Sequence, residues 1–258
     1  MSVGEAFTIP FSAQGTAPQA VQAARDADPA QVGAALGLKP GGLAIAIMGG
    51  AAMMTDDSTR TIRSGLEDGL ARFAQDHNVT IVDGGTAAGV MALMGTARAR
   101  RSFTFPLVGV TVAARTAWPG HEGDAEAAAL DPYHSQFALT GGEDFGDESD
   151  MLAGIALYAA SESGKALGLI INGGAIVKRE AHARATGPLK MPLLVLDDSG
   201  RFADELAEAV QNGSSSDPVV QEMLEQGEVH VLSAHTGARG LRQWLEGYFG
   251  VSPVEELP

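Results

Sequence analysis

The chain has 258 residues, 45% of which are hydrophobic, and this is enough for one large α/β core. Its 32 acidic residues outnumber its 17 basic residues, and a net charge of −15 disfavours nucleic acid and anionic membrane as partners. Cysteine is absent, which excludes disulfides, thiolate nucleophiles and cysteine metal ligands. Because no apolar stretch approaches the roughly 20 residues of a membrane helix and no signal-peptide pattern occurs, we expect a soluble, cytoplasmic protein without membrane insertion.

Residues 1–41 are rich in alanine, glutamine and proline and are predicted to form an N-terminal extension that caps the core. Within this extension we expect a strand at residues 6–10 and short helices near residues 18–26 and 29–36. Pro40-Gly41-Gly42 is a turn signal that ends the segment.

From residue 42 to residue 250, predicted buried strands alternate with amphipathic helices. Continuous apolar strands joined by helical crossovers indicate a Rossmann-like α/β domain, in which a mostly parallel, doubly wound sheet carries helices on both faces. Residues 251–258 are interpreted as a tail. Strands are predicted at residues 43–48, 79–82, 107–112, 136–139, 167–171, 193–196 and 229–232, and helices near residues 58–77, 86–97, 148–162, 176–185, 201–210 and 238–248.

Glycine pairs follow several of these strands, and they are Gly49-Gly50, Gly84-Gly85, Gly141-Gly142 and Gly173-Gly174. Glycine permits a sharp turn and a close approach of backbone N–H groups to a ligand, so the repeated junctions predict one crevice for a phosphate-bearing nucleotide. The motif G-x-G-x-x-G is missing after the first of these strands and G-x-x-x-x-G-K-[ST] is missing throughout, which disfavours a standard NAD dehydrogenase or P-loop NTPase.

Adjacent parallel strands end at the same edge of a sheet, so the first two glycine loops should lie together there. We expect the phosphates to lie against the N–H groups of Gly49, Gly50 and Ala51 and of Gly84, Gly85 and Thr86. Thr86 is also expected to cap the following helix, and Gly89 to let that helix lie close to the sheet or the ligand.

Further polar residues follow the other strands. Glu148 follows Gly141-Gly142 and is the candidate acid/base group or ribose partner, although acidic residues in a first helical turn also serve the helix dipole. His134 is placed to touch a ligand or to be structural, and Asn172 offers a donor and an acceptor to a base or ribose. Arg201 is able to hold a phosphate or to form a surface ion pair. The six histidines show no metal-ligand spacing, and no bound metal is predicted.

Residues 115–133 form the longest predicted loop. Their proline, glycine and acidic residues offer little apolar surface, and we expect a mobile lid. The glycine- and serine-rich segment 212–217 is predicted to be a flexible connector.

These motifs, taken in chain order, resemble the LSDAT family over residues 42–210. That family is the branch of the SLOG superfamily that forms the N-terminal cytosolic region of melastatin-type TRP channels, and it also occurs in bacterial proteins. The resemblance is carried by Gly49-Gly50, GGTAAGVM, LVGVTV, LDPYHSQF, GGEDFGDES, INGG and DDSGRFAD. The chain is similar to the stand-alone prokaryotic type, since no channel segment accompanies the motifs.

The resemblance implies a Rossmann-like domain that binds a nucleotide-derived ligand such as ADP-ribose. The related LOG enzymes cleave the N-glycosidic bond of nucleoside monophosphates with a P-G-G-x-G-T-x-x-E motif and an arginine. Residues 140–147 lack the proline and the Gly-Thr pair, and only Glu148 or Asp150 stands near the place of the glutamate.

Three hypotheses follow. The first is a non-catalytic sensor of an ADP-ribose-like nucleotide, the second is a nucleotide N-glycoside hydrolase that uses Glu148 with Arg201 or Arg98, and the third is an assembly scaffold. The ligand and the oligomeric state, including self-association into a homo-oligomer, remain open.

Overall fold

A nine-stranded sheet forms the centre of the computed structural model, which describes residues 2–50, 54–162 and 164–254. The strand order is β1-β2-β8-β5-β4-β3-β9-β10-β11, and every neighbouring pair is parallel except β1 with β2. The strands are β1 (Phe7–Thr8), β2 (Gln19–Ala23), β3 (Ala44–Gly49), β4 (Thr80–Asp83), β5 (Leu107–Val112), β8 (Gln136–Thr140), β9 (Ala166–Ile171), β10 (Leu193–Asp197) and β11 (Val229–Ser233).

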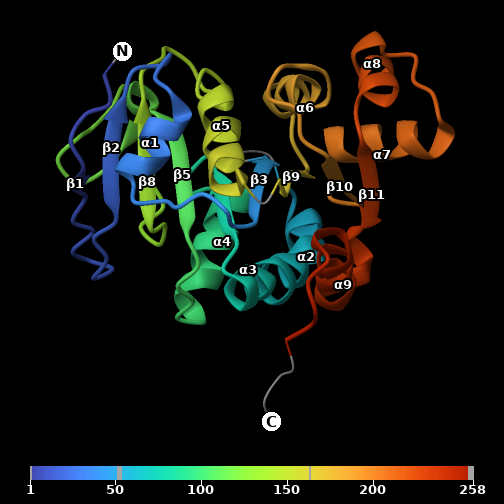
Figure 1. Ribbon diagram of the computed structural model, residues 1–258, viewed down its shortest axis with the longest axis horizontal. Coiled ribbons are helices and arrows are strands. Elements are labelled where there is room, and N and C mark those ends of the chain that lie inside the picture. Colours follow the sequence, from blue (N-terminus) through green and yellow to red (C-terminus); the bar gives the residue numbers. More distant parts are fainter. Residues whose placement is uncertain (1, 51–53, 163, 255–258) are drawn as a thin grey trace.

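Helices cover both faces of this sheet (Figure 1). One layer contains α1 (Pro29–Ala35), α5 (Ser149–Ala160), α6 (Ala175–Thr186), α7 (Phe202–Asn212) and α8 (Pro218–Gln226). The other contains α2 (Asp56–Ser64), the π-helical segment Gly65–Leu70, α3 (Ala71–His77), α4 (Gly89–Arg100) and α9 (Gly237–Phe249). The predicted Rossmann-like, mostly parallel α/β fold is therefore confirmed.

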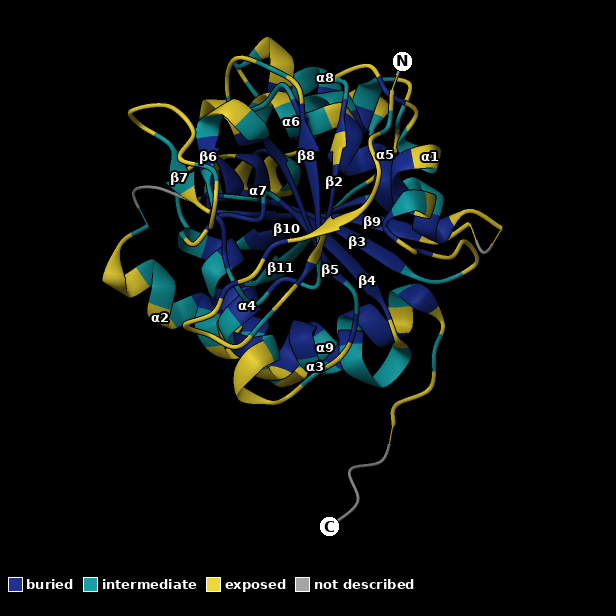
Figure 2. Cartoon of the chain, turned by 90° about the vertical axis from the view of Figure 1, so that its left-hand side faces the viewer, coloured by how far each residue is buried: buried dark blue, intermediate teal, exposed yellow. Residues whose placement is uncertain are grey.

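Strand β3 illustrates how the two layers share one sheet. Successive side chains of a strand point to opposite faces, so Ala44, Ala46 and Met48 pack under the first layer while Ile45 and Ile47 pack under the second. A strand covered on both faces needs a continuous apolar run, and β3, β5 and β9 are of this kind. Figure 2 shows the buried strands between helices whose outer surfaces are exposed.

The prediction of a helix at residues 18–26 was wrong. Residues 19–23 form β2, which pairs in parallel with β8 from Gln19 opposite Gln136 to Ala23 opposite Thr140. Alanine favours helices in isolation, but strand pairing and burial of Ala20 and Val21 against the sheet outweigh that preference. Residues 1–41 therefore supply two strands at one edge of the sheet and helix α1.

Helix α8 was not predicted, although its start carries two standard signals. Asp217 caps the helix by accepting hydrogen bonds from Val219 N and Val220 N, and Pro218 occupies the first turn. None of the helices in the described residues is long and apolar enough to cross a membrane.

The predicted long loop, residues 115–133, is more ordered than expected. It contains the short parallel strands β6 (Thr116–Ala117) and β7 (Ala128–Ala129), and Arg115 forms an ion pair of 2.7 Å with Asp124. We expected this segment to have few apolar contacts with the core. Leu130 is nevertheless buried, and Trp118 packs against an apolar cluster that includes residues of β8. Movement of this segment over a ligand stays a prediction.

Candidate functional site

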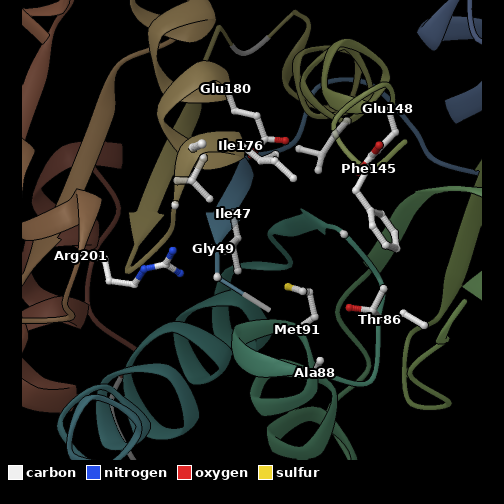
Figure 3. Close-up of a pocket in the computed structure, with 17 residues that line it drawn as sticks. Ile47, Gly49, Thr86, Ala88, Met91, Phe145, Glu148, Ile176, Glu180 and Arg201 are labelled. Atoms are coloured by element: carbon white, nitrogen blue, oxygen red, sulfur yellow. The ribbon is translucent and has the colours of Figure 1, made fainter. Parts of the chain in front are cut away.

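A pocket of about 530 Å³ lies at the carboxyl ends of the parallel strands. The chain runs from β3 outward to β4 and β5, and later returns to place β9 against the other side of β3 before continuing to β10 and β11. Such a reversal of strand order separates the loops on its two sides and leaves a crevice between them, where open α/β sheets bind ligands. The lining residues follow β3, β4, β8, β9 and β10, with contributions from β3 itself and from β7 (Figure 3).

Part of the predicted residue set reaches this pocket. The predicted residues that line it are Gly49, Gly50, Gly84, Thr86, Glu148, Gly174 and Arg201. The predicted residues that do not line it are Gly85, Gly89, His134, Gly141, Gly142, Asn172 and Gly173. Ala51 lies outside the described residues.

One end of the pocket, which we call the anion-binding end, is formed by residues 174–177 and Arg201. Gly174 is the N-cap of α6, so the pocket receives the first-turn N–H groups of a 12-residue helix, which have no acceptor within the helix. Their partial positive charge and the Arg201 guanidinium attract an anion. The guanidinium lies directly over Gly174, since a Cβ added there would come within 2.5 Å of Arg201 Nη2.

The backbone of Arg201 is strained. Its φ of 57° and ψ of −128° belong to a region that glycine adopts and other residues avoid. A non-glycine residue in such a conformation costs of order 1–3 kcal/mol, and residues of this kind cluster at functional sites. Glycine at this position would relieve the strain and remove only the arginine side chain. The strain therefore indicates that the Arg201 side chain itself has a function.

One N–H group in each of the first two glycine loops already donates within the protein and is therefore not available to a phosphate. Gly50 N donates to Ile171 O at 3.2 Å, and Gly85 N donates to Asp83 Oδ1 at 2.8 Å. These glycines are needed instead for close packing. A Cβ on Gly50 would come within 2.8 Å of Asn172 Oδ1, and one on Gly85 would come within 2.8 Å of Gly109 Cα.

Thr86 lines the pocket without capping a helix. The N-cap of α4 is Ala88, and Thr86 precedes the helix. The Thr86 side chain is buried, with the residue 5% exposed, and its Oγ1 has no hydrogen-bond partner among the described residues. Figure 3 shows this hydroxyl directed toward the pocket. An unpaired buried hydroxyl costs about 1–3 kcal/mol, so a polar ligand group at this wall would satisfy it.

The other end, which we call the carboxylate end, brings Glu148 and Glu180 together beside Phe145 (Figure 3). Glu148 Oε2 accepts a hydrogen bond of 2.7 Å from Gly146 N. Burial raises the pKa of Glu148 to about 7; the hydrogen bonds from backbone N–H groups act in the opposite direction, and the charges of Glu180 and Asp147 add to the rise. Burial likewise raises the pKa of Glu180.

Glu180 was not predicted from the sequence. It lies one helical turn after Ile176 on α6, and both side chains line the pocket. The signal available in the sequence was the helix start at Gly174, because residues four apart share one face of a helix. The surface between the two ends is apolar and includes Ile47 and Met91.

His134 takes the structural one of its two expected roles and does not line the pocket. Its side chain is fully buried, and its ring nitrogens lie 2.8 Å from Asp83 Oδ1 and 2.8 Å from Asp131 Oδ2. Burial lowers the pKa of His134, but attraction to Asp83 and hydrogen bonds to Asp131 and Asp83 outweigh it and raise the pKa to about 9. The imidazolium therefore joins the end of β4 to the segment before β8. Helix α4 passes so close that a Cβ on Gly95 would overlap Asp131.

Asn172 also acts inside the protein, with its backbone at a φ of 55°. Its Nδ2 donates to Ser199 O at 2.8 Å, its Oδ1 accepts from Gly173 N at 2.8 Å, and its backbone N donates to Ser199 Oγ at 2.8 Å. The residue is 1% exposed and is therefore not available to a base or ribose. It holds the loops after β9 and β10 together.

The remaining predicted glycines shape turns. Gly89 begins α4 with a φ of 53°, and Gly142 has a φ of 154° with the Asp147 side chain close to where a Cβ would stand. Gly141 packs against the backbone of Arg25. Within the described residues, no group of three or more histidine, aspartate or glutamate side chains is arranged to hold a metal ion.

Comparison with known proteins identifies the family. Residues 43–241 match the family described as "SLOG in TRPM, prokaryote", which covers most of the chain. No curated protein matches the sequence. The chain belongs to this SLOG family, as the resemblance implied.

We predict that Gly85→Ala destabilises the fold by at least about 2 kcal/mol, because alanine is disfavoured at a φ of 68° and its Cβ would overlap Gly109. Gly84→Ala is the matched control. A Cβ there meets only Met91 Cε at 3.8 Å, so stability should change by less than about 1 kcal/mol. Urea unfolding of the two variants tests this, and equal stabilities would contradict the packing role of Gly85.

We predict a pH-dependent contribution from His134. Its pKa is raised from 6.5 to about 9, so the stabilisation is fully present below pH 6.5 and is lost as the pH rises through 9. The difference in unfolding free energy between wild type and His134→Gln should therefore fall by on the order of 3 kcal/mol between pH 6 and pH 10. His235→Gln, at an exposed position, is the matched control for the loss of a histidine side chain. A difference for His134→Gln that does not vary with pH would show that the histidine is neutral.

Proposed function

We propose that the chain binds a phosphate-bearing, nucleotide-derived small molecule, with ADP-ribose as the reference compound. The observation that carries the proposal is one pocket with an anion-binding end at α6 and Arg201, an apolar middle and a carboxylate end. A volume of about 530 Å³ falls within the range of small-molecule sites. Membership of the SLOG family and the resemblance to melastatin-type domains support a nucleotide-derived ligand.

The net charge of −15 does not oppose this proposal. Salt screens charges separated by more than roughly 8 Å, whereas the first-turn N–H groups of α6 and the Arg201 guanidinium act at contact distance. We therefore assign the phosphates to the N-terminus of α6 and not to Gly50 N or Gly85 N, which already donate within the protein.

A second function is favoured by one observation, the pKa of about 7 for the buried Glu148 carboxyl in the pocket. A carboxyl with this pKa is suited to general acid catalysis near neutral pH. In an N-glycoside hydrolase, Glu148 would protonate the departing base while water attacks the anomeric carbon. Binding alone needs no such proton transfer, and it remains the first choice because the glutamate motif of the LOG enzymes is incomplete here.

Arg201 gives a test in which affinity and stability separate. Arg201→Ala and Arg201→Gly should each weaken ADP-ribose binding by about tenfold or more, since each removes a charge-assisted hydrogen bond worth about 1.5–3 kcal/mol. Arg201→Gly should be the more stable of the two by about 1 kcal/mol, because only glycine tolerates this backbone conformation. Calorimetric titration and thermal unfolding measure the two effects.

Lys39→Ala is the control for charge alone. Lys39 is exposed and precedes β3, so it lies near the amino ends of the strands, away from the pocket at their carboxyl ends. Its affinity for ADP-ribose should match wild type. Wild-type affinity in both Arg201 variants would remove Arg201 from the site. Failure of wild type to bind ADP-ribose, AMP or NAD at millimolar concentration would overturn the proposed function.

Glu148→Gln separates binding from hydrolysis, because it keeps the shape and an acceptor while removing the carboxyl proton. For a binding protein, wild type should leave AMP, NAD and ADP-ribose intact over hours, and the variant should bind with modestly changed affinity. Chromatography of the nucleotides measures this. Glu143→Gln, at an exposed site in the same junction, is the matched control. Release of free base by wild type and by this control, reduced by roughly 10² or more in Glu148→Gln, would establish the hydrolase instead.

A further inference from the structure

Glu148 and Glu180 line the same pocket, at the end away from Arg201. We infer that this carboxylate end recognises a nucleobase that carries an exocyclic amino group, with Glu180 accepting the hydrogen bond. The inference rests on the proposed nucleotide-binding function. It specifies which part of the nucleotide binds at the carboxylate end.

The spacing along α6 separates the two ends. Gly174 opens the helix at the anion-binding end, and Glu180 lies about 7.5 Å further along the helix axis than Ala175. Both ends face the same pocket, as Figure 3 shows for Arg201 and Glu180. A phosphate held at the helix N-terminus would therefore place the remainder of a nucleotide, its sugar and base, toward Glu180 and Glu148.

The two carboxyl groups are held in place by short contacts. Ser149 Oγ lies 2.7 Å from Glu180 Oε1 and 2.8 Å from Gly146 O, and Gly146 N donates to Glu148 Oε2. These contacts engage one oxygen of each carboxyl group and link the start of α5 to α6. Ser149 fixes the orientation of Glu180, and Figure 3 shows the Glu180 side chain directed into the pocket, where its carboxyl group can accept a hydrogen bond from a ligand.

The charges around this end favour a hydrogen-bond donor. Arg184 donates to Asp150 at 2.6 Å, and Arg184 and Arg179 each lower the pKa of Glu180, but burial outweighs them. Two acids in a desolvated site repel a phosphate and each other. A ligand group that offers N–H bonds lowers the cost of burying them.

The apolar surroundings distinguish a base from a sugar. Phe145, Leu152 and Ile176 line the pocket beside the glutamates. A flat base presents two apolar faces and polar edges, so it fills such a space while its amino group reaches a carboxylate. Ribose presents hydroxyls around its ring, and the apolar side chains would leave several of them without partners.

A ligand comparison on the unaltered protein tests the inference. AMP and purine riboside 5′-monophosphate differ only by the 6-amino group, and ribose 5-phosphate lacks the base. We expect AMP to bind about tenfold or more tightly than purine riboside 5′-monophosphate in calorimetric titration, because a ligand without the amino group leaves a desolvated carboxyl oxygen unpaired, at a cost of about 1–3 kcal/mol. Equal affinities for these two nucleotides would overturn the inference while leaving nucleotide binding intact. No binding of any of the three would overturn the proposed function, and the inference with it.

Variants then assign the acceptor. Glu180→Ala should bring the affinity ratio of AMP to purine riboside 5′-monophosphate to within about twofold of one, because the amino group loses its partner. Glu208→Gln removes a negative charge from an exposed position on α7 and should keep the wild-type ratio. A folded Glu180→Ala protein that keeps the wild-type ratio would overturn the assignment to Glu180. The wild-type comparison does not depend on the folding of any variant.

Discussion

Close approach between neighbouring backbones at the carboxyl edge of the sheet is the constraint on which the pocket depends. The loop after β3 contacts the loop after β9 where Gly50 meets Asn172, and the loop after β10 contacts it where Gly200 meets the Asn172 side chain. A Cβ at either glycine would come within 2.8 Å of these atoms. Loops packed this tightly allow helices α4, α5 and α6 to begin beside one another, so that residues at or near their N-termini line one cavity. The glycine pairs thus build the site mainly by packing, and the ligand-facing groups come from the helix starts that they position.

Two groups of acids near this edge have opposite electrostatic character. Asp83 and Asp131 hold the His134 imidazolium between them, so a cation compensates both carboxylates and the group is fully enclosed. Glu148 and Glu180 line the pocket instead, and burial raises the pKa of both, although Arg184 and Arg179 act in the opposite direction on Glu180. A buried charge needs a partner, and where the protein supplies one the group stabilises the fold. Where the partners within the protein do not offset the cost of burial and a cavity lies alongside, a further partner is expected from a ligand, and such perturbed acids mark functional sites.

The sequence predicted the fold well because most of its strands are long apolar runs. Strand β2 was missed since its alanines have helical propensity and only its pairing with β8 makes it a strand. Residues directly after strands, such as Gly174 and Arg201, were found in the pocket because a parallel sheet collects those positions at one edge. His134 and Asn172 lie close to strand ends as well, but hydrogen bonds to Asp83 and Ser199 respectively hold them inside the protein. The sequence does not reveal these pairings, because the partners are far apart along the chain. Glu180 was missed for another reason, since it lies mid-helix and faces the pocket only through the phase of α6.

The two ends of the pocket are built by different physical means. Around the anion-binding end, Asn172, Asp198 and Arg201 all have positive φ, at 55°, 65° and 57°. Each such residue costs of order 1–3 kcal/mol, which is a substantial fraction of the 5–15 kcal/mol that stabilises a typical domain. At the carboxylate end, Glu148 has an ordinary φ of −82° and Glu180 lies within regular helix. Strained loops therefore fix the position of the guanidinium, whereas the acids lie on ordinary backbone and are held by contacts with Gly146 N and Ser149 Oγ. At the carboxylate end, Glu180 can be replaced without a change of backbone, because it lies within a regular helix. The anion-binding end depends on a backbone conformation that the neighbouring loops must hold in place.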